Sequence, residues 1–233
     1  MVENHNLNFS SLIEPLTVEE FEQEYKGKKF CIIKGNKFRQ KFYKDIITWT
    51  KFSDYINNDR AVAGIQAIPS KGKKLCMEKE NLYRNNKPHW TLPTRFDKEY
   101  LHSIWNNNGS IILTRASLLT PNISAIAGAI EKHFKGACDA HFYCSKKSTS
   151  KSFNVHKDHD DNFLVHSYGS VKWTVANGFE SNEFSVFKLT VGDMLYIPKG
   201  LYHCANPLSK RISISVPLAE IDQPLDRKYY SFT

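Results

Sequence analysis

Histidines and carboxylates concentrate in one short stretch, Ser152–Val175, which reads SFNVHKDHDDNFLVHSYGSVKWTV. His156 and Asp158 are two residues apart, just before an apolar run at 163–165. On a strand edge, side chains at positions i and i+2 share one face. An imidazole nitrogen and a carboxylate oxygen can then point at one metal ion, so we interpret this stretch as half of a metal site.

A second histidine ends the segment Gly192–His203, GDMLYIPKGLYH, in which a turn, a strand and a second turn precede His203. Two histidines and one carboxylate leave coordination positions open, as in non-haem Fe(II) sites that also hold a co-substrate and O₂. An H-x-D pair alone is a weak signal, because a histidine such as His156 is more often a surface residue. Together the two segments predict His156, Asp158 and His203 as the metal ligands and the catalytic centre.

Short strand-like runs alternate with turns after Gly136 and would position these residues. So many short strands in so little sequence are typical of an antiparallel sandwich or barrel. The predicted strands are 138–144, 162–167, 171–176, 184–189, 194–197 and 211–217.

Helical patterns are more frequent in the N-terminal half. In the clearest, 121–135, Thr120 can cap the helix, Pro121 fits its first position and Gly136 ends it. The other expected elements are helices at 17–25, 51–58 and 97–106 and a strand at 29–34. The pattern predicts one mainly β domain with helices packed on a β-barrel.

Composition narrows the class of protein. The 233 residues are 41% hydrophobic and 13% aromatic, which suits a globular domain with a sizeable core. No apolar run approaches the roughly 20 residues that span a bilayer, and the N-terminus lacks a secretory pattern. Five cysteines without a CxxC pair indicate reduced thiols. We therefore expect a cytoplasmic protein with no membrane partner, either a monomer or a homodimer.

The net charge of +8 permits two interpretations. Lysines cluster at 27–29, 71–74 and 146–151, which can indicate a nucleic-acid neighbourhood. A solvated, lysine-rich surface is the simpler interpretation, and no nucleic-acid-binding motif supports the other.

The two motifs resemble those of the JmjC and cupin-like Fe(II)/2-oxoglutarate oxygenases, most closely the ribosomal-oxygenase and asparaginyl-hydroxylase branch. The matching positions are H-x-D-x-x-x-N-F-L-V at His156–Val165, then Gly169 and Trp173, and G-D-x-L-Y-I-P-x-G-x-x-H at Gly192–His203. The resemblance implies a double-stranded β-helix (jelly-roll or cupin) core with an N-terminal α/β elaboration. It further implies Fe(II), 2-oxoglutarate as co-substrate and O₂, which together yield succinate and a hydroxylated C–H bond.

On this resemblance the chain is a single domain over 1–233. The N-terminal elaboration would cover 1–136, the β-helix core 137–217 and a C-terminal tail 218–233. His156, Asp158 and His203 would be the iron ligands, and Asn162 would contact the co-substrate.

One position departs from the family pattern. Val171 stands where the family usually has Lys or Arg to pair with the far carboxylate of 2-oxoglutarate. Lys172 is adjacent, but strand alternation turns it to the other side. Arg211 and Ser213 share a face of the last predicted strand, and other branches of these oxygenases use R-x-S at about this place. We hypothesise that Arg211 anchors the carboxylate with help from Ser213, with Lys172 as the alternative and a surface position for Arg211 as the ordinary interpretation.

Other residues keep two interpretations each. Tyr143 can hydrogen-bond the co-substrate or pack in the core, and His166 can line the pocket or be a core histidine. His159–Asp161 form a solvated turn or contact substrate. The mixed aromatic and cationic stretch Leu82–Trp90 is a loop or a roof over the cleft.

The favoured function is hydroxylation of a protein or peptide side chain. The same chemistry on an amino acid, a nucleoside or a natural-product intermediate is the closest alternative. A metal cupin without O₂ chemistry usually has three histidines and a carboxylate, and a silent binding module has no need of the triad.

Overall fold

The computed structural model describes residues 7–57, 64–71 and 98–221, with the backbone of short strands between 75 and 96. Its helices are α1 (Phe9–Ile13), α2 (Val18–Glu24), α3 (Lys37–Lys44), α4 (Trp49–Asn57), α5 (Lys98–Asn106) and α6 (Pro121–Phe134). None of the helices in these ranges has the length and apolarity that crossing a bilayer requires.

The strands of the N-terminal half are β1 (Cys31–Ile33), β2 (Gly64–Ile68), β3 (Leu75–Cys76), β4 (Glu78–Lys79), β5 (Tyr83–Arg84), β6 (Lys87–Pro88), β7 (Arg95–Phe96) and β8 (Ser110–Thr114). Those that follow α6 are β9 (Ala137–Cys138), β10 (His141–Ser145), β11 (Asp161–Tyr168), β12 (Ser170–Ala176), β13 (Phe184–Thr190), β14 (Met194–Ile197), β15 (His203–Pro207) and β16 (Arg211–Ala219).

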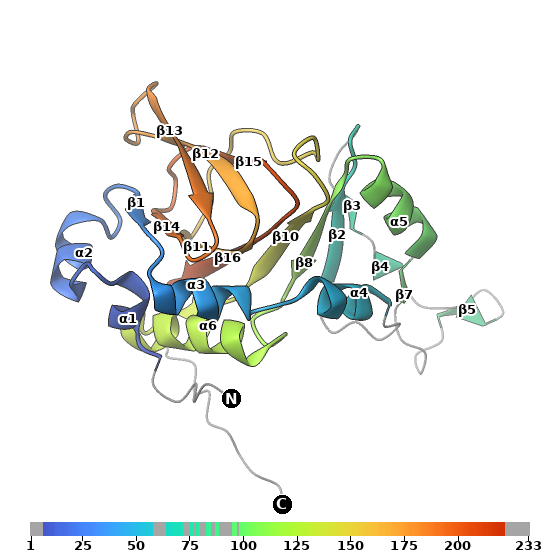
Figure 1. Ribbon diagram of the computed structural model, residues 1–233, viewed down its shortest axis with the longest axis horizontal. Helices are drawn as coiled ribbons and strands as arrows, with labels where there is room; N and C mark the ends of the chain where they lie inside the picture. Colours follow the sequence, from blue (N-terminus) through green and yellow to red (C-terminus); the bar gives the residue numbers. More distant parts are fainter. Residues whose placement is uncertain are drawn as a thin grey trace, which may run out of the picture.

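Most of these strands form two antiparallel sheets. The larger runs β1-β14-β11-β16-β10-β8-β2-β3, with β9 also paired to β16, and the smaller runs β13-β12-β15. Figure 1 shows the smaller sheet on one side of the larger sheet and helices α3 and α6 on the other. The predicted fold class, a mainly β double-stranded β-helix with added helices, is confirmed.

Alternation along β11 divides its buried side chains between two cores. Phe163 and Val165 face the helices and join the larger apolar core, which includes residues of α1, α2 and α6. Leu164, between them, faces the smaller sheet and packs with Val171 and Trp173 of β12. Successive side chains of a strand point to opposite faces, so each buried strand serves both cores.

Polar side chains gather in the space between the two sheets. On β16, buried Arg211, Ser213 and Ser215 alternate with Ile212 and Ile214, which belong to the helix-side core. Pairing with both β10 and β11 holds β16 in the middle of the larger sheet. A strand with polar residues on its inner face is therefore locked at the centre of the fold.

The predicted helix at 121–135 is α6, and its start follows the prediction, with Thr120 as N-cap residue. Its end differs, because Lys135 rather than Gly136 adopts the left-handed conformation (φ 53°, ψ 36°). Gly136 is required by packing instead, since a Cβ there would lie 2.7 Å from the backbone carbonyl oxygen of Ala219.

Several elements differ from the prediction. The expected strand at 138–144 is interrupted, because β9 ends at Cys138 and β10 begins at His141. β15 starts at His203 itself and was not predicted, and neither were α1, α3, β2 or β8. These elements are short, and short segments carry too few residues for a clear periodic pattern.

The turn between β11 and β12 depends on Gly169. Its φ is +75°, and a Cβ there would lie 1.9 Å from the carbonyl oxygen of Lys210.

We expect Gly169→Ala to lower the free energy of unfolding by about 2 kcal/mol or more, measured by urea denaturation. Gly128→Ala is the matched control, because Gly128 lies inside α6 with nothing within 4 Å of the added Cβ. This control should raise the free energy of unfolding by about 0.5–1 kcal/mol, and equal effects of the two changes would contradict the account of Gly169.

Candidate metal centre

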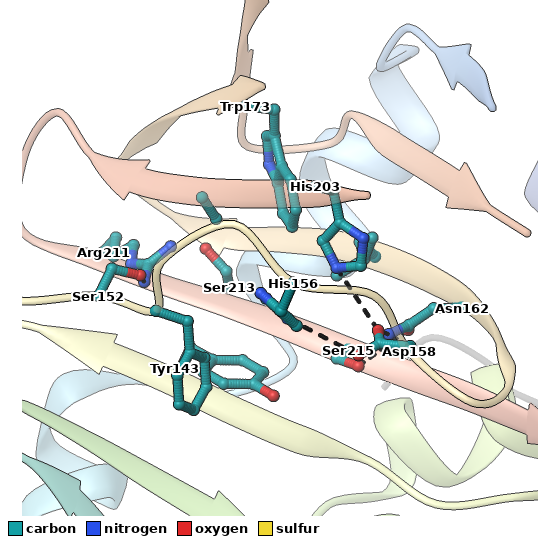
Figure 2. Close-up of a pocket in the computed structure, with 13 residues that line it drawn as sticks. Tyr143, Ser152, His156, Asp158, Asn162, Trp173, His203, Arg211, Ser213 and Ser215 are labelled. Carbon is teal, nitrogen blue, oxygen red and sulfur yellow. Dashed lines mark hydrogen bonds and ion pairs between the residues drawn. The ribbon is translucent and has the colours of Figure 1, made fainter. Parts of the chain in front are cut away.

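His156, Asp158 and His203 converge on one point beside β11 (Figure 2). His156 Nε2 lies 3.7 Å from Asp158 Oδ1, and His203 Nε2 lies 3.5 Å from Asp158 Oδ2. One ligand atom from each residue lies within 4.8 Å of the other two. Donors that bind one ion at about 2.0–2.2 Å are separated by distances of this order. The structure thus brings together the three residues that the sequence predicted as ligands.

Each imidazole is oriented by a hydrogen bond to the backbone carbonyl oxygen of the residue two positions before it. His156 Nδ1 lies 2.8 Å from the carbonyl oxygen of Asn154, and His203 Nδ1 lies 2.9 Å from that of Leu201. A carbonyl only accepts, so each Nδ1 carries the proton and each Nε2 keeps a free lone pair. Burial lowers the pKa of His203 despite the opposing charge of Asp158, so this ring is neutral at pH 7. Both Nε2 atoms are therefore suited to bind a metal ion.

The two ligand-bearing segments are tied together by backbone hydrogen bonds. His156 N donates to His203 O at 3.0 Å and His203 N donates to His156 O at 2.8 Å. Gly200 N also donates to Asp158 O at 2.9 Å. The sequence placed His156 and Asp158 on a strand edge, and this is wrong, because His156 forms only one isolated bridge in an irregular segment. The convergence comes from cross-segment bonds and not from strand alternation.

Asn162 holds the carboxylate of Asp158. Its Nδ2 donates to Asp158 Oδ2 at 2.8 Å, and its Oδ1 accepts from Ser215 Oγ at 2.8 Å. Asn162 also lines the adjoining cavity. Its predicted contact with the co-substrate stays a prediction. The hydrogen bond to Asp158 is a role that sequence reasoning did not assign.

Asp161 was expected in a solvated turn, and this is wrong. Only 4% of the residue is exposed, and it opens β11. It accepts hydrogen bonds from Lys26 Nζ at 2.6 Å, from Tyr196 OH at 2.8 Å and from Lys199 N at 2.8 Å. Asp161 thereby joins the turn after α2 to the turn that precedes His203. His159 is exposed, in agreement with the prediction of a solvated turn.

A narrow cavity with a volume of about 40 Å³ extends from the metal centre between the sheets. Figure 2 shows the three candidate ligands at one end of this cavity and Arg211 with Ser152 at the other. Its lining includes Tyr143, Ser152, Phe153, Asn162, Leu164, Trp173, Ala205, Arg211, Ser213 and Ser215. The inner face of β16 therefore supplies polar groups along the length of the cavity.

Arg211 is a buried cation, only 2% exposed. Its Nε donates to Ser145 Oγ and its Nη2 to Ser152 Oγ, each at 3.2 Å. In the described part of the chain no carboxylate forms an ion pair with it. Burial lowers the pKa of Arg211 to about 10, so the side chain remains charged at pH 7. An uncompensated buried charge is costly, which favours an anion in the cavity.

Lys172 does not reach this cavity. It is exposed on the outer face of β12, whereas Val171 and Trp173 face the space between the sheets. The alternative assignment of the carboxylate anchor to Lys172 therefore has no geometric support.

Tyr143 lines the cavity, and burial, with the charge of Asp158 adding to it, raises the pKa of its phenol. It is therefore a neutral hydrogen-bonding group at pH 7. His166 is fully buried and hydrogen-bonds Trp173 and Ser213, so it is a core histidine behind the cavity wall rather than a lining residue. The side chains of Leu82–Trp90 lie outside the described residues.

A broader cleft also reaches Asp158, with a volume of about 280 Å³. It shares Tyr143, Phe153, Asp158 and Asn162 with the narrow cavity. The remaining lining residues are Gln66, Ile112, Thr114, His141, His159, Asp160, Ser215 and Pro217. Asp158 thus borders both the narrow inner cavity and this broader outer cleft.

Removing the carboxylate should weaken metal binding. We expect Asp158→Asn to reduce Co(II) affinity at least about 100-fold, because a neutral amide replaces the anionic ligand. Isothermal titration of the metal-free protein with Co(II) measures this. Asp160→Asn is the control, since it removes a nearby carboxylate outside the cluster of ligands. Equal losses in the two variants would argue against a site at Asp158.

Burial lowers the pKa of His166 from 6.5 to about 3, with the charge of Arg211 adding to the effect. In the unfolded chain this imidazole gains a proton as pH falls below about 6.5, whereas in the folded protein it stays neutral. Wild type should therefore lose about 2 kcal/mol more of its free energy of unfolding between pH 7 and pH 5 than His166→Gln does. Urea denaturation of metal-free protein at the two pH values measures the difference, and parallel pH dependences would contradict a buried neutral His166.

Comparison with known proteins agrees with this geometry. Residues 122–223, which contain all three candidate ligands and Arg211, match the JmjC domain family. The bifunctional lysine-specific demethylase and histidyl-hydroxylase NO66 of Dictyostelium discoideum is 21% identical over 219 residues, covering 84% of this chain and 39% of NO66.

Solved structures of similar fold include YcfD, a ribosomal oxygenase from Escherichia coli. One matches with a TM-score of 0.61 at 16% identity, covering 94% of this chain and 59% of that chain. Another, in complex with cobalt and 2-oxoglutarate, has a TM-score of 0.60 at 17% identity. This chain spans about two fifths of the length of NO66 and about three fifths of that of YcfD.

The resemblance drawn from two sequence motifs is therefore confirmed by a family match and by the fold. The matched segment begins in α6 and runs through β16, the strand that carries Arg211. Residues 122–223 of this chain are thus similar to the JmjC domain family, and the fold is similar to that of YcfD.

Proposed function

We propose that this protein is an Fe(II)- and 2-oxoglutarate-dependent oxygenase that hydroxylates a protein side chain. One observation carries the proposal: a cluster of two histidines and one aspartate opens onto a narrow cavity that ends at a buried arginine, with which no carboxylate in the described part of the chain forms an ion pair. The cluster suits a metal ion, and the arginine suits an anion bound beside that ion.

The donor set fits Fe(II). Two neutral imidazoles and one carboxylate are the ligands of non-haem iron sites that keep positions open. Bound iron would supply the activation of O₂, coupled to decarboxylation of 2-oxoglutarate to succinate. His156, Asp158 and His203 would hold the ion. Asn162 would keep the Asp158 carboxylate in place through its hydrogen bond at 2.8 Å.

The cavity suits an unbranched dicarboxylate. Its small volume, about 40 Å³, disfavours bulky molecules, and its walls include the apolar Leu164, Trp173 and Ala205, which would keep water from the bound chain. Arg211 would receive the far carboxylate, since Nε and Nη2 are held by Ser145 and Ser152 and fix the plane of the guanidinium. A charge-assisted hydrogen bond from a fixed guanidinium is stronger than one between neutral groups. Arg211 of β16 would thereby take the role of the Lys or Arg that the family usually has at the position of Val171.

The outer cleft is where we place the prime substrate. It reaches the metal centre at Asp158 and is broad enough to admit a side chain from the surface. NO66 is named as a histidyl-hydroxylase and lysine-specific demethylase, and YcfD as a ribosomal oxygenase. These relatives support a protein side chain as substrate for this chain as well.

The first test is turnover. Protein loaded with Fe(II) should convert 2-oxoglutarate to succinate, and peptide pools should contain a product heavier by one oxygen atom. Without O₂, mixing Fe(II) and 2-oxoglutarate with the protein should produce a visible charge-transfer absorption. Neither succinate nor this absorption would form if the fold served a metal cupin without O₂ chemistry.

The second test concerns the carboxylate anchor. We expect Arg211→Met to raise KM for 2-oxoglutarate about tenfold or more, because a charge-assisted hydrogen bond contributes roughly 1.5–3 kcal/mol. Lys172→Met is the matched control, since it removes a cation of β12 that faces solvent. Its KM should equal that of wild type. A raised KM in Lys172→Met with an unchanged KM in Arg211→Met would reverse the assignment.

A further inference from the structure

His166 is a buried imidazole to which the proposed chemistry gives no role. It is 0% exposed, lies on the inner face of β11 and is not among the residues that line the cavity. Trp173 Nε1 lies 3.1 Å from its Nε2, and Ser213 Oγ lies 3.2 Å from its Nδ1. The ring therefore joins the smaller sheet to β16 directly behind the cavity wall.

The direction of these hydrogen bonds follows from the chemistry of the groups. An indole N–H only donates, so Nε2 of His166 must accept. A neutral imidazole has a single N–H, which must then be on Nδ1, and Nδ1 must donate to Ser213 Oγ. Burial keeps the ring neutral, since it lowers the pKa of His166 to about 3. Trp173 thus selects the tautomer of His166, and that tautomer makes Ser213 an acceptor toward the core.

The hydroxyl proton of Ser213 is consequently free for another partner. In the described part of the chain, the hydrogen bond with His166 is the one that Ser213 Oγ makes. Ser213 lines the cavity on the same strand face as Arg211, two residues along β16. A guanidinium can only donate. Arg211 and Ser213 can therefore both present hydrogen-bond donors to the cavity.

We propose that His166 is a positioning residue that, with Trp173, holds the Ser213 hydroxyl as a fixed donor and so selects a carboxylate at the Arg211 end of the cavity. The inference rests on the proposed function, because the selected ligand is 2-oxoglutarate. A carboxylate accepts from both donors. A carboxamide that replaces the carboxylate in the same orientation has an NH₂ group in place of one oxygen. This NH₂ group would face the Arg211 or the Ser213 donor, and that donor would be left without an acceptor.

A double-mutant cycle tests the coupling between His166 and Ser213. The probe is 2-oxoglutarate titrated without O₂ into Fe(II)-loaded wild type, His166→Leu, Ser213→Ala and the double variant. Each single change should raise Kd about five- to tenfold, and the double variant should match Ser213→Ala within about twofold. If the increase in Kd of the double variant equals the product of the two single increases, His166 acts by packing alone and the inference is overturned.

A conservative variant supplies a second readout. In His166→Gln, the amide oxygen can accept from Trp173 and the amide nitrogen can donate to Ser213. Kd for 2-oxoglutarate should therefore return to within about twofold of wild type. If His166→Leu fails to fold, Trp173→Phe replaces it in the cycle, because it keeps an aromatic ring and removes the indole donor. Failure of Gln to restore binding would contradict the hydrogen-bond relay.

Nitrogen NMR of the ring separates this inference from the proposed function. In metal-free wild type at pH 7, His166 should show a protonated Nδ1 and an unprotonated Nε2, and Trp173→Phe should mix the tautomers. A proton on Nε2 in wild type would overturn the relay whatever the ligand. Wild type that shows the expected tautomer but binds no 2-oxoglutarate would remove the proposed function and the ligand selection together. Binding of 2-oxoglutarate with the wrong tautomer would remove the inference alone.

Discussion

The pairing of β11 with β16 is the constraint on which the site depends. The register sets Asn162, Leu164 and His166 of β11 beside Pro217, Ser215 and Ser213 of β16. Because side chains alternate, one register turns all of these toward the smaller sheet and turns the apolar residues between them toward the helices. A slip by one residue would exchange the two sets. It would place polar groups in the helix-side core and apolar groups in the cavity.

The metal centre adds irregular backbone to this regular frame. His156 and Asp158 precede β11, and they are held against the start of β15 by reciprocal backbone hydrogen bonds. Asp161 joins the same region to the turn after α2 through Lys26 and to the turn before His203 through Lys199. Hydrogen bonds therefore connect three segments that are distant in sequence: the turn at Lys26, the segment 156–161 and the segment 199–203. Residues that bind a metal need to be held in place by neighbouring groups that are themselves hydrogen-bonded, and this arrangement meets that need.

The charge distribution in the cavity is asymmetric. Anionic Asp158 stands at one end and cationic Arg211 at the other, with neutral Tyr143 and the serines between them. A metal ion would offset the first charge and a carboxylate the second. The two charges together favour a molecule that binds metal at one end and carries an anion at the other.

Sequence reasoning succeeded where the signal was local. Two short motifs indicated His156, Asp158 and His203, although backbone bonds between distant segments bring them together. Strand alternation predicted correctly that Lys172 faces away from the cavity. Asp161 could not be assigned, since its partner Lys26 is 135 residues away and nothing near Asp161 indicates burial. The role of His166 was open for the same reason, because its two partners come from different strands.

A crystal structure of the protein grown with Co(II) and 2-oxoglutarate tests the central claim most directly. The account predicts one Co(II) ion bound by His156 Nε2, Asp158 and His203 Nε2, with 2-oxoglutarate lying along the narrow cavity and its far carboxylate on Arg211 and Ser213. Co(II) bound away from these three residues would contradict the account, and so would a 2-oxoglutarate whose far carboxylate lies away from Arg211.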